Sequence, residues 1–204
     1  MIKKLLVTVL LALCVVLPTF ASENWIGVST GGDFSFGENT IGSDETEYST
    51  FNVPLQASGM SFFGEDSSVG LSYNVGLSFP ISRTEDGEKV DTSDNPSSFV
   101  ASAGPVFRIS NSGAMDLLVG AGFRLASTTW SNDLGEIKTT LIGVYGDVAI
   151  ASNMNKNIVM VAGAKLGFNY SKKMEVTLLG FTNTIEGENS EFIVNPYMGV
   201  YYKF

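Results

Sequence analysis

The last thirteen residues of the chain alternate between two kinds of side chain. Every second position is apolar or aromatic: Phe192, Val194, Pro196, Met198, Val200, Tyr202 and Phe204. The positions between them are mostly polar, small or tyrosine. A period of two is the signature of a β-strand whose two faces meet different surroundings. Any fold of this chain must therefore give its final strand two distinct environments.

The same alternation recurs along the rest of the chain, whereas helical periodicity is nearly absent. The clearest interior example runs from Val69 to Ile81, where apolar residues alternate with glycine, serine and asparagine. We predict eight strands, over residues 25–36, 50–61, 68–81, 98–109, 115–128, 137–151, 158–171 and 191–204. The first is weak because it contains Gly31 and Gly32. The fold class is therefore all-β.

Short and long connections alternate between the predicted strands. The short ones are rich in glycine, serine, asparagine and aspartate: residues 64–67, 110–114 and 152–157. The long ones are more polar: residues 37–49, 82–96, 129–136 and 172–190. This order is typical of an up-and-down antiparallel barrel with short periplasmic turns. We interpret residues 172–190 as a hairpin that extends the last two strands, and a ten-stranded barrel is the alternative.

The face opposite the apolar one indicates a membrane rather than water as the surroundings. It carries small residues such as Gly70, Ser72 and Gly76, which suit the crowded inside of a narrow barrel. Charged residues make up only 16% of the chain, against about 25% in soluble domains. No apolar run after residue 22 approaches the ~18 residues of a membrane helix. We therefore predict an eight-stranded antiparallel up-and-down transmembrane β-barrel, with a soluble periplasmic barrel as the alternative.

Residues 1–21 have the pattern of a secretory signal peptide. Two lysines precede a largely apolar run that ends at Leu17, and Thr19 and Ala21 supply the small residues of a cleavage site. We expect cleavage after Ala21 and a barrel domain over residues 22–204. The expected location is the bacterial outer membrane.

Most charged residues inside the predicted strands share the phase of the small residues. They include Asp33, Asp116, Lys203 and the four residues of a predicted network, Arg108, Arg124, Asp147 and Lys165. An unpaired charge in a low-dielectric interior is costly, so these side chains should pair with one another. We predict a polar network in the lumen in which Asp147 is shared by Arg108, Lys165 and Arg124. Such a network either lines a selective pore or simply fills the lumen, and eight strands leave little room for a pore.

Aromatic residues near the strand ends predict two interfacial belts. One contains Trp25, Phe62, Phe63, Tyr202 and Phe204 at the periplasmic side, and the other contains Phe51, Phe99, Trp130 and Tyr170. Three prolines, Pro54, Pro105 and Pro196, fall within predicted strands. Because proline cannot donate to a β-ladder, they should mark bulges, strand ends or register changes.

The composition argues against catalysis. The chain has no histidine, so neither a Ser–His–Asp triad nor a His-ligated metal site can be built. Its single cysteine, Cys14, lies in the predicted signal peptide. We expect no enzymatic activity, cofactor or metal. The net charge of −9 also argues against nucleic acid as a partner.

The final strand resembles the C-terminal signal of bacterial outer-membrane barrels. The resemblance lies in Met198, Val200, Tyr202 and the terminal Phe204. Together with chain size and strand count, it makes the chain similar to small barrels of the OmpA/OmpX/OmpW type. The resemblance implies outer-membrane lipid and the barrel-assembly machinery as partners. We expect a structural or surface-interaction role with acidic outer loops, and the alternative is a narrow pore for small or hydrophobic solutes.

Overall fold

A computed structural model describes residues 21–41, 44–64, 68–92, 95–111, 115–132, 135–178 and 181–204. Its strands are β1 (Glu23–Gly31), β2 (Asp33–Ile41), β3 (Asp44–Phe63), β4 (Val69–Glu85), β5 (Glu88–Val90), β6 (Ser98–Asn111), β7 (Met115–Asn132), β8 (Gly135–Asn153), β9 (Ile158–Leu178) and β10 (Phe181–Lys203). The predicted signal peptide, apart from Ala21, lies outside the described residues. Among the described residues there is no helix long and apolar enough to cross a membrane.

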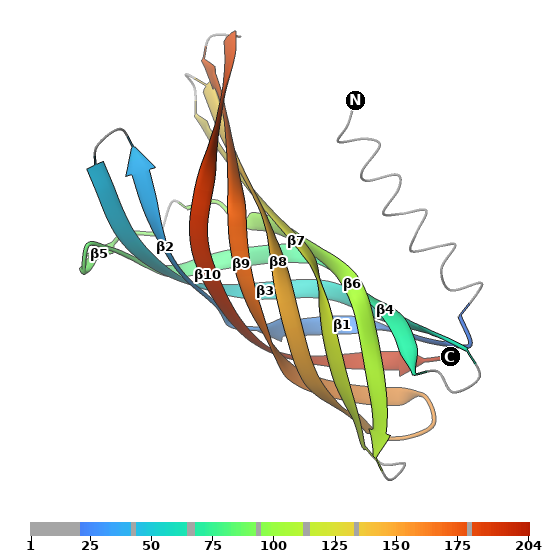
Figure 1. Cartoon of the computed structure of the whole chain (residues 1–204). Helices are drawn as coiled ribbons and strands as arrows, with labels where there is room; N and C mark the ends of the chain where they lie inside the picture. The colour runs from blue at the N-terminus through green and yellow to red at the C-terminus, as the bar shows by residue number, and fades with distance from the viewer. Residues whose placement is uncertain are drawn as a thin grey trace.

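The strands form one closed antiparallel barrel (Figure 1). β1 and β2 follow each other as one barrel strand, and both pair with β10 on one side and β3 on the other. The seam runs from Trp25 opposite Lys203 to Gly31 opposite Tyr197. β5 pairs only with β4 and stands outside the ring. The ring therefore has eight strands, as predicted, and the ten-stranded alternative is wrong.

The two ends of the barrel differ (Figure 1). The start of β1, the end of β10 and the strand ends that flank the short connections lie at one end, called here the terminus end; Asn24 and Phe204 exchange backbone hydrogen bonds there. The opposite end, called here the hairpin end, carries long hairpins. The predicted long loops are mostly strand: β9 and β10 remain paired out to Leu178 and Phe181. Backbone pairing continues there despite the polar composition, because a hairpin ladder needs no apolar face.

The apolar phase of each strand faces outward. Large apolar residues exposed on the outer surface are Ile26, Val28, Leu55, Leu77, Phe107, Val119, Phe123, Val148, Ile150, Leu166, Met198 and Val200. Arg124 and Lys165 both line interior cavities, which confirms the predicted phase. On the final strand, Tyr201 is buried inside while Tyr202 is exposed outside. An apolar outer surface with the charged side chains of the strands turned inward is the arrangement of a membrane barrel.

Three aromatic residues predicted for the interfacial belts lie on the inward-facing phase of their strands instead. Trp25 and Phe62 are 0% exposed and pack edge to face with ring centroids 5.0 Å apart. Trp130 lines the cavity at the hairpin end. Their strand phase points inward, which position along the chain does not reveal. Tyr202 and Phe204 lie outside, as predicted, with stacked rings 6.1 Å apart.

The prolines lie where the ladders are interrupted. Pro54 and Pro196 flank Gly32, the residue between β1 and β2, on its two sides. The amide of Gly32 still donates to the carbonyl of Pro196 at 3.0 Å. The β6–β7 pairing skips Pro105, resuming from Ala103 at Val106. Each proline thus lies at a position where the regular pattern of backbone hydrogen bonds between strands is already interrupted, so its missing N–H removes no bond from that pattern.

Candidate functional site in the barrel interior

An apolar plug fills the interior at the terminus end. It consists of the buried side chains Trp25, Met60, Phe62, Val106, Leu118, Ala149, Ala151, Val159, Val161 and Tyr201. These residues come from β1, β3, β6, β7, β8, β9 and β10, so the plug joins most of the ring. Interiors of this kind are close-packed, with few voids larger than water.

A charged cluster around Glu23 covers the plug at the rim. The Glu23 carboxylate accepts hydrogen bonds from the Arg108 guanidinium and, at 2.7 Å, from Trp25 Nε1. Its other oxygen lies 3.1 Å from Lys203 Nζ. The Arg108 guanidinium stacks 4.4 Å from the centroid of the Phe62 ring. One carboxylate therefore ties β1 to β6 and, across the seam, to β10.

A polar layer follows above the plug, centred on Asp147 and Tyr197. The Tyr197 hydroxyl donates to the Asp147 carboxylate at 3.0 and 3.1 Å. Lys165 stands directly opposite Asp147 on the neighbouring strand. Its Nζ lies 5.2 Å from the ring centroids of both Tyr145 and Tyr197. The lysine thus lies beside a carboxylate-bearing neighbour and over two aromatic faces.

A second ion pair lies next to this layer, toward the hairpin end. Arg124 donates to Asp33 Oδ2 at 3.1 Å, which joins β7 to β2. Beside it, the Asn195 amide donates to the Gly32 carbonyl at 2.8 Å. This pair forms the floor of the cavity described below.

The predicted lumen network is only partly assembled as proposed. Asp147 and Lys165 are neighbours, but Asp147 is not shared with Arg108 or Arg124. Arg108 pairs with Glu23 at the rim, and Arg124 pairs with Asp33. The prediction of Arg108 and Arg124 as partners of Asp147 is wrong because their strands are staggered, which places them at different levels.

Sequence reasoning missed one member of this interior and one pairing within it. Glu23 is the first residue of the first strand, and no alternation marks it as inward. Tyr197 shares the phase of the small lumen residues, which places it inside but does not identify Asp147 as its partner.

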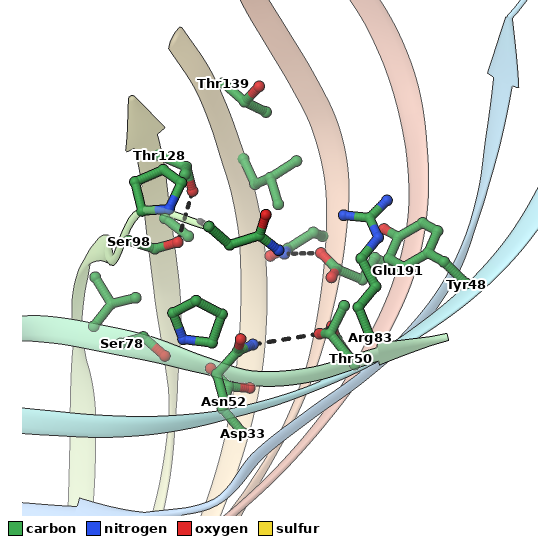
Figure 2. Close-up of a pocket in the computed structure, with 18 of the residues that line it drawn as sticks. Asp33, Tyr48, Thr50, Asn52, Ser78, Arg83, Ser98, Thr128, Thr139 and Glu191 are labelled. Atoms are coloured by element: carbon green, nitrogen blue, oxygen red, sulfur yellow. Dashed lines mark hydrogen bonds between the residues drawn. The ribbon is translucent and has the colours of Figure 1, made fainter. Parts of the chain in front are cut away.

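A polar cup opens at the hairpin end, above the Arg124–Asp33 pair (Figure 2). Its volume is about 280 Å³. Its lining is rich in hydroxyl and amide groups: Ser35, Thr50, Asn52, Ser78, Ser82, Thr92, Asn95, Ser98, Thr128, Thr139 and Asn169. Several of these pair within the wall, such as Ser98 with Thr128 at 2.6 Å and Asn52 with Thr50 at 3.3 Å.

Charged and aromatic side chains surround the mouth of the cup. The Arg83 guanidinium lies 5.3 Å from the Tyr48 ring centroid and pairs with Glu85 at 2.6 Å. Burial, together with the nearby Glu191 carboxylate, raises the pKa of Tyr48. Burial also lowers the pKa of Lys172, and the Arg83 charge adds to this effect. Figure 2 shows Tyr48, Arg83 and Glu191 gathered on one side of the cup.

Strands β7 to β10 continue past the cup as a four-stranded sheet, called here the distal sheet. β6 pairs with β7 only up to Thr128, whereas β7–β8, β8–β9 and β9–β10 pair out to their turns. In the described pairings, β10 between Phe181 and Glu188 contacts β9 alone, and pairing with β2 starts at Ser190. This part of β10 is therefore an open sheet edge.

The distal sheet has one apolar face. Cross-strand partners point to the same face, so the register places on one side the exposed residues Trp130, Ile137, Leu178, Phe181 and Ile185. Phe181, at the tip, is 83% exposed. The opposite face is polar and includes Lys138, Glu175 and Thr184. Exposed apolar surface of this kind marks interaction sites.

Within the described part of the chain, no three His, Cys, Asp or Glu side chains gather closely enough to hold a metal ion. No protein-family model and no curated protein sequence matches this chain.

Solved structures, by contrast, share the architecture. A major outer membrane protein from Thermus thermophilus superposes with a TM-score of 0.56 at 10% identity, over 90% of this chain and 100% of that one. The outer membrane protein OprG from Pseudomonas aeruginosa gives 0.54 at 12% identity, over 90% and 96%. The N-terminal β-barrel domain of OprF from the same organism gives 0.50 at 13% identity, over 90% and 98%.

These likenesses show the fold. The chain has the architecture of the small outer-membrane β-barrel proteins, and its outward apolar surface is the one such a barrel presents to lipid.

Proposed function

We propose that this protein is a non-conducting outer-membrane barrel that binds an extended strand of a partner protein at the distal sheet. The terminus end then faces the periplasm and the distal sheet stands outside the cell, as in barrels with short periplasmic turns. The open edge of β10, beside an exposed apolar face, carries the proposal.

The partner's chemistry follows from this edge. Unpaired backbone groups along Phe181–Glu188 can hydrogen-bond an added strand, which supplies affinity. Alternate side chains of that strand would pack on the apolar face around Phe181 and Ile185. The expected ligand is an extended segment in which apolar and polar residues alternate.

Selection from a phage-displayed library of linear peptides tests the surface role. Peptides enriched on the folded protein should alternate apolar and polar residues, and they should lose binding to a Phe181→Asp/Ile185→Asp variant. A Thr182→Asp/Thr184→Asp variant on the polar face is the matched control and should keep binding. Enrichment without alternation, or binding that the first variant leaves intact, would refute the proposal.

Planar-bilayer recording tests the closed state. The plug and the polar layer above it occupy the lumen between its two ends. We therefore expect no discrete conductance steps from the purified barrel. Reproducible steps would favour the pore instead.

A second candidate, passage of hydrophobic solutes, has one observation in its favour. A cavity of about 480 Å³ lies where the β2–β3 hairpin diverges from β10, and its lining includes Phe36, Phe168 and Phe192. Tyr48 lines both this cavity and the cup. If this were a route, the barrel would speed uptake of a fluorescent alkyl probe into liposomes, and Gly37→Trp would block it. Equal uptake with and without the barrel would exclude this function.

A further inference from the structure

Among the described residues, the wall of the cup includes buried hydrogen-bonding atoms that no protein group satisfies. Asp33 is 5% exposed and Ser78 is 4% exposed, yet Asp33 Oδ1 and Ser78 Oγ have no hydrogen-bond partner. Both residues line the cup and lie on the same side of it in Figure 2. Buried polar atoms are nearly always paired, so an unpaired one at a cavity wall calls for an explanation.

The two atoms define what could pair with them. A carboxylate oxygen only accepts, so Asp33 Oδ1 requires a donor; a serine hydroxyl can both donate and accept. A hydroxyl group meets either requirement. The surrounding wall offers further hydroxyl and amide groups from β3, β4, β6 and β7, including Thr50 and Thr128.

Charge balance in the cup favours an uncharged ligand. Asp33 is neutralised by Arg124, and Arg83 pairs with Glu85. The remaining charged residues of the lining, Glu191 and Lys172, carry opposite charges, and Glu191 also accepts a hydrogen bond from the Asn169 amide at 2.6 Å. An ionic ligand would add an unbalanced charge to a half-enclosed site, which is unfavourable. Trp130 and Tyr48 also offer aromatic surface against which the C–H face of a ring can pack.

We propose that the cup binds a small, uncharged, polyhydroxylated molecule, either a free monosaccharide or the terminal sugar of a glycan. Its hydroxyl groups hydrogen-bond Asp33 Oδ1 and Ser78 Oγ at the floor. The volume of about 280 Å³ lies just below the roughly 300–1,000 Å³ of pockets for drug-sized ligands, which suits a single sugar ring. The cup shares Trp130 with the apolar face of the distal sheet. Its floor atoms, on Asp33 and Ser78, belong to β2 and β4, which are not part of that sheet, so sugar binding can be tested independently of the proposed strand binding.

Calorimetric titration of the full-length protein tests the proposal. The protein is held in a zwitterionic detergent without a sugar headgroup, because maltoside or glucoside would compete. The probes are glucose, galactose, mannose and N-acetylglucosamine, each with its methyl glycoside and an oligosaccharide ending in that sugar. We expect saturable binding of at least one sugar. Tighter binding of the oligosaccharide than of the glycoside would identify a glycan as the source, and equal binding a free sugar; both support the site.

Three variants locate the binding. Ser78→Ala should weaken it about threefold to tenfold, the effect of one neutral hydrogen bond, and Asp33→Asn about tenfold. Ser72→Ala is the matched control, because Ser72 is buried on the same face of β4 below the cup and should leave binding unchanged. The mobility shift on boiling verifies that each variant is folded. No binding to the folded wild type, or equal affinity of wild type, Ser78→Ala and Asp33→Asn, would overturn the proposal.

Discussion

At the scale of single residues, Glu23 holds the terminus end together. Its carboxylate accepts hydrogen bonds from Arg108 and Trp25 and forms an ion pair with Lys203. Replacing Glu23 by alanine leaves the Arg108 guanidinium against aromatic rings without its counter-ion. We expect Glu23→Ala to lower the free energy of unfolding by about 3 kcal/mol. The measurement is the fraction of protein that still migrates as the folded form in unboiled samples as the urea concentration rises.

An exposed carboxylate supplies the comparison. Glu175 lies 3.6 Å from Lys173 on the distal sheet, where both side chains are substantially exposed. Exposed pairs contribute little, so Glu175→Ala should change stability by less than about 1 kcal/mol. Equal effects of the two substitutions would contradict the role assigned to Glu23.

The Arg124–Asp33 pair makes a second prediction at this scale. Removing one partner leaves a buried charge uncompensated, whereas removing both does not. Arg124→Met and Asp33→Asn should each destabilise the barrel, and the double variant should be more stable than the sum predicts by about 1–3 kcal/mol. Additive effects in the same urea titration would show that the two residues are not coupled.

These residues also mark where sequence reasoning ends. The alternation of side chains predicts that Arg108, Arg124, Asp147 and Lys165 point inward. It does not give their position along the barrel axis, because that position depends on how far each strand is shifted relative to its neighbours. A shift by two residues leaves the inward and outward faces unchanged, so the alternation cannot distinguish such registers. Asp147 and Lys165 meet because they are direct cross-strand partners, whereas Arg108 and Arg124 meet other carboxylates.

At the scale of elements, the seam between β1 and β10 depends on close backbone approach. A Cβ added at Gly27 would lie 2.0 Å from the carbonyl oxygen of Val200. We therefore expect Gly27→Ala to destabilise the barrel by about 3 kcal/mol or to prevent its closure. Electrophoresis of unboiled samples should then show a smaller fraction of the protein at the faster mobility of the folded barrel.

Gly146 is the matched control for the seam. It lies in β8, and a Cβ added there meets nothing within 4 Å. Alanine in a strand avoids the conformational entropy cost of glycine, so Gly146→Ala should be neutral or stabilising by about 0.5 kcal/mol. A similar loss of folded protein in both variants would show that the effect is not specific to the seam.

The elements themselves were largely predictable, apart from their lengths. Eight segments with period-two alternation become eight barrel strands, and even the weak first strand keeps one phase through its interruption at Gly32. For the hairpins at the hairpin end, the sequence predicts loops, apart from residues 172–190, because polar residues dominate these segments. Strand pairing outside a bilayer depends on backbone hydrogen bonds and a tight turn. Asp86 and Gly87 make such a turn between β4 and β5, where both have positive φ.

At the scale of the whole molecule, the two ends of the lumen have opposite character. The terminus end is packed with aromatic and aliphatic side chains, and the hairpin end opens into a polar cup. Two charged or polar contacts, Asp147 with Tyr197 and Arg124 with Asp33, separate them. Such a barrel can hold a small ligand in the cup at the hairpin end while the lumen stays closed toward the terminus end. Ligand binding and ion conduction are therefore independent properties of this barrel.

The plug therefore makes a prediction about permeability. Trp25 and Phe62 are fully buried in it, and their rings pack against each other. Trp25→Ala/Phe62→Ala should remove enough packed volume to admit water at the terminus end, and planar bilayers should show small conductance steps that the wild type lacks. Phe99→Ala/Phe107→Ala removes two aromatic rings from the outer surface and should stay silent. If the plug variant is folded and equally silent, the polar layer around Asp147 is sufficient to close the lumen by itself.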